Sequence, residues 1–186
     1  MAAVSARRRG SPVHILLGLA AVVAIAGCGD AARRGTRPSA AVSAKLDWQR
    51  IPLSDLRSRP VTLAQVLGGH PALVNLWAPW CARCKVELAD LDRLARRLEG
   101  CAVVVGVAVG EDATHTADFV SERGLGYTQV VDESFHLADA LGQSRVPTTL
   151  IVDRDGAIVH VGPEADGVAV GALESLVRSC CPPGGR

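Results

Sequence analysis

Two cysteines separated by two residues are the part of this sequence best suited to chemistry. Cys81 and Cys84 lie between an apolar run that ends at Trp77 and a segment with helical periodicity. Cysteines at this spacing form disulfides or bind zinc, so the spacing alone leaves both open. The context favours redox chemistry, because a thiol on the first turn of a helix lies where backbone N–H groups and the helix dipole stabilise a negative charge.

The same context predicts a reactive thiolate at Cys81. The pKa of this thiol is expected to lie below its usual value, and the positive charges of Arg83 and Lys85 act in the same direction. A thiolate can attack a disulfide in another protein, and a neighbouring thiol such as Cys84 can then resolve the mixed disulfide. Residues 81–84 are therefore predicted to exchange disulfides with other proteins.

Apolar runs alternate with amphipathic segments around the two cysteines. The runs predict strands over residues 72–77, 101–109, 127–131, 148–152 and 157–161. The amphipathic segments predict helices over residues 85–99, 114–124, 134–141 and 166–177, with Thr114 and Asp166 as N-caps. Weaker signals at residues 51–53 and 61–67 indicate an added edge strand and a helical turn. This order predicts an α/β fold with a mixed central sheet and helices on both faces.

The first 27 residues are predicted to be an export signal. Three arginines, Arg7 to Arg9, precede an apolar stretch over residues 13–26, which is shorter than the roughly 20 residues of a membrane-spanning helix. The stretch ends in Ile25-Ala26-Gly27-Cys28, which is similar to a bacterial lipobox. Cys28 is therefore expected to carry a lipid anchor. An ordinary signal peptide and an uncleaved anchor are the alternatives.

The remaining segments differ in composition. Residues 28–44 are rich in Arg, Ala, Ser and Gly and are predicted to be a flexible tether, whereas residues 45–181 carry the folded domain. The tail over residues 182–186 contains two prolines and two glycines and is predicted to be disordered. A near balance of 20 Lys and Arg against 19 Asp and Glu, with 3% aromatic residues, argues against a nucleic-acid partner.

Two motifs together resemble the thioredoxin superfamily. They are Trp77-Ala78-Pro79-Trp80-Cys81-Ala82-Arg83-Cys84 and, about 65 residues later, Val146-Pro147-Thr148-Thr149. The closest likeness is to the exported, membrane-anchored TlpA-like branch, and it covers about residues 45–178. The resemblance implies a thioredoxin-like fold with an N-terminal extension and a thiol–disulfide oxidoreductase that works outside the cytoplasm without a cofactor.

The resemblance also assigns roles and partners. It makes Cys81 the exposed nucleophile, Cys84 the resolving thiol and Pro147 a cis-proline beside them. Trp80 would flank the site, and Val146 would offer its backbone to an extended substrate. The implied partners are cysteine-containing exported proteins and a membrane redox partner that resets the cysteine pair. Cytochrome c maturation and oxidative protein folding need the same residues, so the direction of electron flow stays open.

Three positions near the cysteines modify this expectation. Asn75 stands where thioredoxin itself has a buried Asp, so it cannot take up a proton. Glu87, one helical turn after Cys84, is the candidate to exchange a proton with that thiol, and the alternative is a solvated residue paired with a basic side chain. Arg83 stands where the family often has Pro, and its charge is expected to make the pair more oxidising.

A further disulfide is predicted away from this site. Cys101 could be a small core residue. A thioredoxin-like arrangement, however, puts the start of its strand at the end of the sheet far from the reactive pair, where the last helix also ends. We therefore expect Cys101 to pair with Cys180 or Cys181. Such a bridge would close about 80 residues and contribute roughly 4 kcal/mol to stability.

Three other functions compete with disulfide exchange. A carrier of copper(I) could use the same soft thiolates, although the histidines lack a ligand spacing and no metal site is predicted. A relative of the peroxidases would need a Thr three residues before the reactive cysteine, where Ala78 stands. A redox-silent binding module would contain an unreactive disulfide between Cys81 and Cys84.

Overall fold

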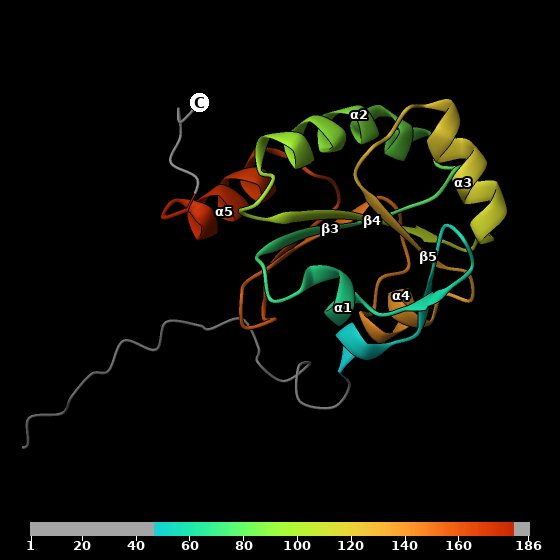
Figure 1. Cartoon of the computed structure of the whole chain (residues 1–186), viewed down its shortest axis with the longest axis horizontal. Helices are drawn as coiled ribbons and strands as arrows, with labels where there is room; N and C mark the ends of the chain where they lie inside the picture. The colour runs from blue at the N-terminus through green and yellow to red at the C-terminus, as the bar shows by residue number, and fades with distance from the viewer. Residues whose placement is uncertain (1–46, 181–186) are drawn as a thin grey trace, which may run out of the picture. The chain divides into compact units, whose positions relative to one another are not determined.

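A seven-stranded mixed sheet forms the centre of the computed structural model, which describes residues 47–180 (Figure 1). The strand order is β2-β1-β5-β4-β3-β6-β7. The strands are β1 (Leu53–Asp55), β2 (Pro60–Val61), β3 (Ala72–Trp77), β4 (Val103–Val109), β5 (Thr128–Asp132), β6 (Thr148–Val152) and β7 (Ile158–Gly162). Strands β3, β4 and β5 are parallel to one another, whereas β6 runs antiparallel to β3 and β1 runs antiparallel to β5.

Helices cover both faces of this sheet. One face carries α2 (Ala82–Arg97), α3 (Ala113–Glu122) and α5 (Gly167–Val177), and the other carries α1 (Leu63–Leu67) and α4 (His136–Ala140), as Figure 1 shows. A short 3-10 helix, η1 (Trp48–Arg50), precedes β1. The predicted α/β fold class is therefore confirmed.

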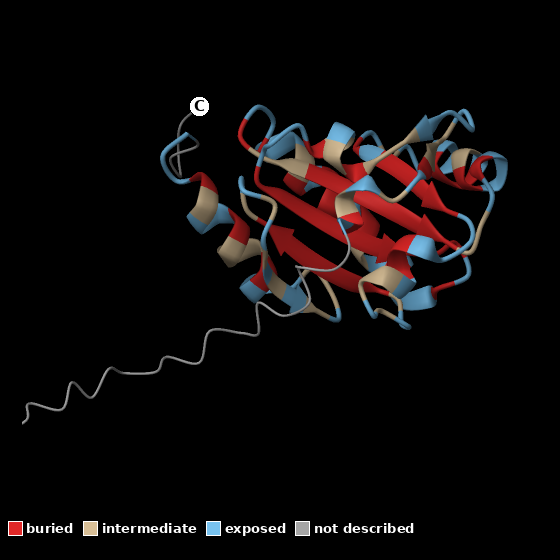
Figure 2. Ribbon diagram, turned by 90° about the horizontal axis from the view of Figure 1, so that it is seen from below, coloured by how far each residue is buried: buried red, intermediate tan, exposed pale blue. Residues whose placement is uncertain are grey.

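The sheet is buried because its central strands carry apolar side chains toward both helical layers. All six residues of β3 are buried, with Val74 and Leu76 in the cluster beside α1 and Leu73 in the cluster beneath α2 and α5. Figure 2 shows this distribution: the central strands are buried along most of their length, and most exposed residues lie in the loops and on the outer sides of the helices. Parallel strands covered on both faces are expected to have such continuous apolar runs.

The strand directions decide where a site can form. The C-terminal ends of β3, β4 and β5 lie together, and β6 begins beside them because it runs the opposite way. We call this side of the sheet the site edge. It receives the start of α2, which follows β3 directly, whereas Cys101 precedes β4 at the opposite edge.

Most predicted elements match the structure, with small differences at their ends. Strands β3 and β6 occupy the predicted residues 72–77 and 148–152. Helix α3 begins earlier than predicted, because Asp112 rather than Thr114 is its N-cap and accepts the N–H of His115. Asp166 caps α5 as predicted.

Several predictions fall on parts of the chain that the structure does not describe. They are the signal peptide, Cys28, the tether over residues 28–44 and the tail over residues 182–186. Among residues 47–180, no helix is long and apolar enough to span a bilayer.

Candidate active site

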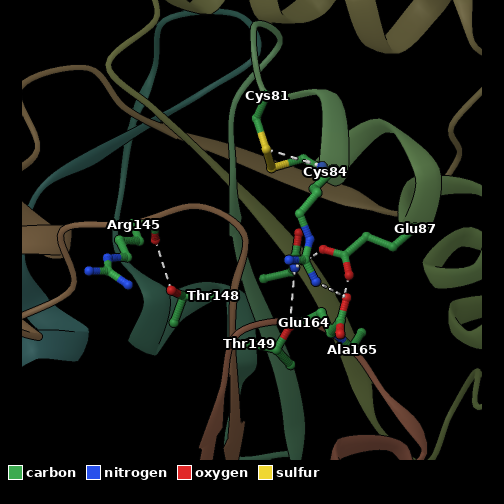
Figure 3. The surroundings of a disulfide bond; sticks show 10 residues. Cys81, Cys84, Glu87, Arg145, Thr148, Thr149, Glu164 and Ala165 are labelled. Carbon is green, nitrogen blue, oxygen red and sulfur yellow. Dashed lines mark hydrogen bonds and ion pairs between the residues drawn. A yellow bond between two sulfur atoms is a disulfide. The ribbon is translucent and has the colours of Figure 1, made fainter.

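The reactive pair lies where α2 begins at the site edge. Cys81 is the N-cap of the helix, and its sulfur accepts the backbone N–H of Cys84 at 3.1 Å. The two cysteines are joined by a disulfide, with their Cα atoms 5.3 Å apart (Figure 3). The Cys81 sulfur therefore takes the capping position usually held by a serine or aspartate oxygen, and one of the free amides in the first turn of the helix points at it.

Cys81 and Cys84 differ in their exposure to solvent. Cys84 is fully buried, whereas Cys81 keeps 7% of its surface exposed and adjoins Trp80, which is 61% exposed. Both cysteines belong to a cluster of buried residues that includes Trp77 and Leu88. An incoming group can therefore approach the pair only from the side of Cys81.

The second predicted motif lies beside the first. The peptide bond between Val146 and Pro147 is cis, and Val146 packs against the cluster that contains Cys81 and Cys84. Strand β6 begins at the next residue, Thr148, whose hydroxyl donates to the carbonyl of Arg145 at 2.8 Å (Figure 3). That hydrogen bond holds the loop in place before the strand begins. Segments about 65 residues apart in sequence thus meet at the site edge.

Glu87 is half-buried on the side of α2 that faces the sheet. Its Oε1 accepts the side-chain amide of Asn75 at 2.8 Å, and its Oε2 accepts the backbone N–H of Ala165 at 3.1 Å (Figure 3). Asn75 also donates to the hydroxyl of Thr149 at 3.2 Å. Burial raises the pKa of the Glu87 carboxyl, and the hydrogen bonds from Ala165 and Asn75 partly oppose that rise. The alternative that Glu87 is a solvated residue with a basic partner does not match this environment.

Arg83 has a partner that the sequence did not indicate. Its guanidinium lies 2.9 Å from the carboxylate of Glu164, in the segment between β7 and α5. Both side chains are largely exposed. The ion pair balances part of the positive charge that was expected to act on the Cys81 thiolate, and it connects the first turn of α2 to the segment just before α5.

A glycine in β4 makes room for a buried polar contact beneath α2. A Cβ atom at Gly106 would lie 2.1 Å from Oε1 of Gln129, so the Gln129 side chain crosses over this glycine. The same oxygen accepts the indole N–H of Trp77 at 3.0 Å. The roles of Gly106 and Gln129 were not predicted from the sequence. The one available signal was a glycine inside an otherwise apolar strand, which indicates close approach of another group.

The other cysteines lie away from the reactive pair. Cys101 is disulfide-bonded, whereas Cys180 is an exposed free thiol. Cys28 and Cys181 lie outside the described residues. Pairing of Cys101 with Cys181 therefore stays a prediction, and pairing with Cys180 is not present. Among residues 47–180, no three His, Cys, Asp or Glu side chains come together as metal ligands.

A disulfide at the first turn of a helix, beside a cis-proline and on a mixed sheet covered by helices, defines a protein of thioredoxin-like fold. The chain belongs to the AhpC/TSA family, whose model matches residues 41–161. It is similar to the "Thiol:disulfide interchange protein DsbE" of Pseudomonas aeruginosa, with 32% identity over 124 residues that cover 66% of this chain and 67% of that protein.

Other relatives agree with this placement. The "Thiol-disulfide oxidoreductase ResA" of Bacillus subtilis is 30% identical over 114 residues, which are 61% of this chain and 58% of that protein. The chain thus spans less than two thirds of the length of that relative. Among solved structures, a DsbF homologue from Corynebacterium diphtheriae matches with a TM-score of 0.58 and 28% identity, covering 69% of this chain and 83% of the other.

Proposed function

We propose that this protein is a thiol–disulfide oxidoreductase that exchanges disulfides with exported proteins through Cys81 and Cys84. The observation that carries the proposal is the Cys81–Cys84 disulfide at the N-terminus of α2, beside the cis peptide bond before Pro147. The names of the relatives DsbE and ResA support the same chemistry. The reaction begins at Cys81, because Cys84 is fully buried.

The reaction transfers two electrons between two sulfur pairs. In the reducing direction, the Cys81 thiolate attacks one sulfur of a client disulfide, the client S–S bond breaks, and the released client thiolate takes a proton. The Cys84 thiolate then attacks the Cys81 sulfur, which releases the second client thiolate and closes the Cys81–Cys84 disulfide. The client gains two electrons and the protein loses two. The oxidising direction is the reverse sequence.

Glu87 is the residue proposed to handle the proton of Cys84. The carboxyl lies on the same helix one turn beyond Cys84, and its hydrogen bonds to Asn75 and Ala165 fix its orientation. Burial raises its pKa, which brings the acid closer in strength to a thiol and makes proton transfer between the two groups less uphill. Asn75 is a positioning residue in this scheme, since its amide carries no titratable proton.

Serine variants of the two cysteines test the assignment. Cys81→Ser should abolish exchange, because no thiolate remains to attack. Cys84→Ser should still attack and should accumulate a mixed disulfide that a non-reducing gel detects, because no second thiol resolves it. Cys180→Ser is the matched control and should retain full activity. Unimpaired turnover by the Cys81 variant would refute the function.

The site of action is proposed to be the outer side of the cell membrane, with a lipid on Cys28. The support is the apolar stretch over residues 13–26 that ends in Ile25-Ala26-Gly27-Cys28. Cys28→Ser should lose incorporation of labelled palmitate and move from the membrane fraction to the soluble extracytoplasmic fraction. Retention of the label by that variant would contradict the lipid anchor.

The reduction potential of the cysteine pair determines the direction of electron flow. Titration of the Cys81 and Cys84 pair against glutathione distinguishes the two roles: about −270 mV is typical of a reductant such as thioredoxin, and about −120 mV of a strong oxidant. A reductant would suit delivery of electrons to apocytochrome c, and an oxidant would suit oxidative folding of exported proteins. Trapping of clients by the Cys84→Ser variant would then name the substrate.

A further inference from the structure

Phe135 presents an aromatic ring at the site edge in a backbone conformation that bulky residues rarely adopt. Its φ is 60°, in the left-handed region, and the residue is 44% exposed. A side chain of this size avoids that region because its Cβ crowds the backbone. Strain of this kind persists only where the surrounding structure imposes it, and it is concentrated at functional sites.

The neighbours of Phe135 impose this conformation. Asp132, at the end of β5, accepts the backbone N–H of Phe135 through its carbonyl at 3.2 Å. Its carboxylate accepts the N–H groups of Leu137 and Ala138 at 3.0 and 2.9 Å, which starts α4. The ring lies over Gly110, where a Cβ atom would be 2.2 Å from Cζ of Phe135. The ring is thus held over the end of β4 even though nearly half of the residue faces solvent.

This ring lies on the same edge as the reactive pair. Gly110 directly follows β4, which neighbours β3, and β3 leads to Cys81. Adjacent strands are about 4.8 Å apart, so the end of β5 lies about 10 Å across the edge from the end of β3. The chain contains three Trp, one Tyr and two Phe. Only Trp80 and Phe135 among them are exposed, and both lie at the site edge.

We infer that Trp80 and Phe135 bind an apolar side chain in the client segment that carries the reacting cysteine. The inference rests on the proposed function and adds a preference in the client. An extended chain advances about 3.3 Å per residue, so a cysteine at Cys81 places the residue about three positions away over Phe135. The occupant is therefore an extended polypeptide with a large apolar residue at that separation, since an exposed aromatic surface offers contact area and no charge.

Two matched peptides and two variants test the inference. Each probe is the disulfide-linked homodimer of a short peptide, with Leu in one and Ser in the other placed three residues from its cysteine. Phe135→Gly removes the ring and suits the left-handed backbone. Phe135→Asn replaces the ring with a polar side chain that tolerates the same backbone. Val159→Ala, on β7 near the opposite edge of the sheet, is the control, because Val159 is exposed to a similar extent, at 47%.

The reduced wild-type protein should reduce the Leu peptide five- to tenfold faster than the Ser peptide, which corresponds to about 1 to 1.4 kcal/mol. Both Phe135 variants should lose this preference while they reduce glutathione disulfide at the wild-type rate, and the Val159 variant should keep the preference. Thermal unfolding should show that both Phe135 variants are folded, since glycine and asparagine each relieve the backbone strain at position 135.

Two results would overturn the inference. Phe135 variants that keep the preference for Leu would show that the ring does not bind the client. Variants that lose the same factor on glutathione disulfide would show that the ring acts on the cysteine pair itself. A wild-type protein that reduces neither peptide nor glutathione disulfide would instead refute the proposed function, and the client preference with it.

Discussion

At the site edge of the sheet Cys81 begins α2, whereas at the opposite edge Cys180 follows the end of α5. The sulfur of Cys81 accepts a backbone N–H at the positive end of a helix. The sulfur of Cys180 lies 3.3 Å from the carbonyl of Val177, to which its S–H donates at the negative end of a helix. The Arg154 guanidinium also donates to the Cys180 sulfur, at 3.7 Å. The two sulfurs therefore differ in their surroundings: that of Cys81 is bonded to Cys84 at a helix N-terminus, whereas that of Cys180 is an exposed free thiol beyond a helix C-terminus.

Cys101 shows a third environment for sulfur, also at the opposite edge. It is buried, disulfide-bonded and packed in the same apolar cluster as Val177, near the end of α5. Within residues 47–180, no exposed aromatic residue or cis-proline lies beside it. We therefore expect a bonded cysteine to take part in exchange only where a client can reach it and a helix N-terminus stabilises the leaving thiolate.

At the opposite edge, the largest expected effect is the loss of stability in a Cys101 variant. Cys101→Ser should lower the free energy of unfolding by roughly 4 kcal/mol, because a bridge to Cys181 would close about 80 residues. Urea denaturation measures the loss, and Cys181→Ser should lose the same amount if the two cysteines are partners. Exchange activity should stay at the wild-type level in both variants. A Cys101 peptide joined to Cys28 in unreduced protein would contradict the pairing.

At the site edge, Glu87→Gln should lower the exchange rate. The variant should slow exchange by about 100-fold, which is the low end for loss of a general acid–base group. Stopped-flow measurement of mixed-disulfide resolution tests this, because attack by Cys81 should be unchanged and only the step at Cys84 should slow. Equal slowing of both steps would contradict a role for Glu87 that is specific to Cys84.

The same variant should also change how stability depends on pH. The folded-state pKa of Glu87 is raised above 4.5, so the folded protein holds this proton more tightly than the unfolded chain. The resulting stability is fully present below pH 4.5 and is lost as pH rises through the raised pKa. Urea denaturation across that range should show this loss in the wild type and not in Glu87→Gln.

A smaller effect is expected at the ion pair between Arg83 and Glu164. Glu164→Gln should leave the Arg83 charge unbalanced, stabilise the Cys81 thiolate and raise the reduction potential by about 10 mV, because an exposed charge contributes about 0.5 kcal/mol. Arg83→Ala should lower the potential by a similar amount. Shifts of the same sign in the two variants, measured against glutathione, would show that the pair does not tune the site.

The smallest effect belongs to Cys180. Cys180→Ser should leave the exchange rate unchanged. It should change the free energy of unfolding by no more than about 0.5 kcal/mol, because the free thiol is exposed. Denaturation and exchange assays with the same preparation test both halves of this expectation. A loss of exchange would break the contrast between the two edges.

Local patterns were sufficient to predict the central strands and the cysteine site. Strands β3 and β6 are continuous apolar runs bounded by turn residues, so their ends could be located from the sequence. The two-residue strand β2 could not, because it exists through its pairing with β1, which in turn pairs with β5. A strand of that length has no periodicity of its own.

The contacts that define the chemistry of the site were less predictable, because they join distant residues. Arg83 and Glu164 are 81 positions apart, and Glu87 meets the backbone of Ala165 only after α5 folds against α2. The left-handed backbone at Phe135 was also unexpected, because local preference disfavours it and tertiary contacts impose it. Sequence patterns predicted which residues react, and the fold determined what surrounds them.

The hydrogen bond from the Cys84 amide to the Cys81 sulfur gives this protein an internal spectroscopic reporter. The sulfur atom proposed to react also accepts an amide from the first turn of a 16-residue helix. Every change in its bonding, from disulfide to thiolate to client adduct, alters the charge that this amide proton meets. The nitrogen-15 and proton frequencies of Cys84 should therefore follow each stage of turnover without any added label at the reacting atoms.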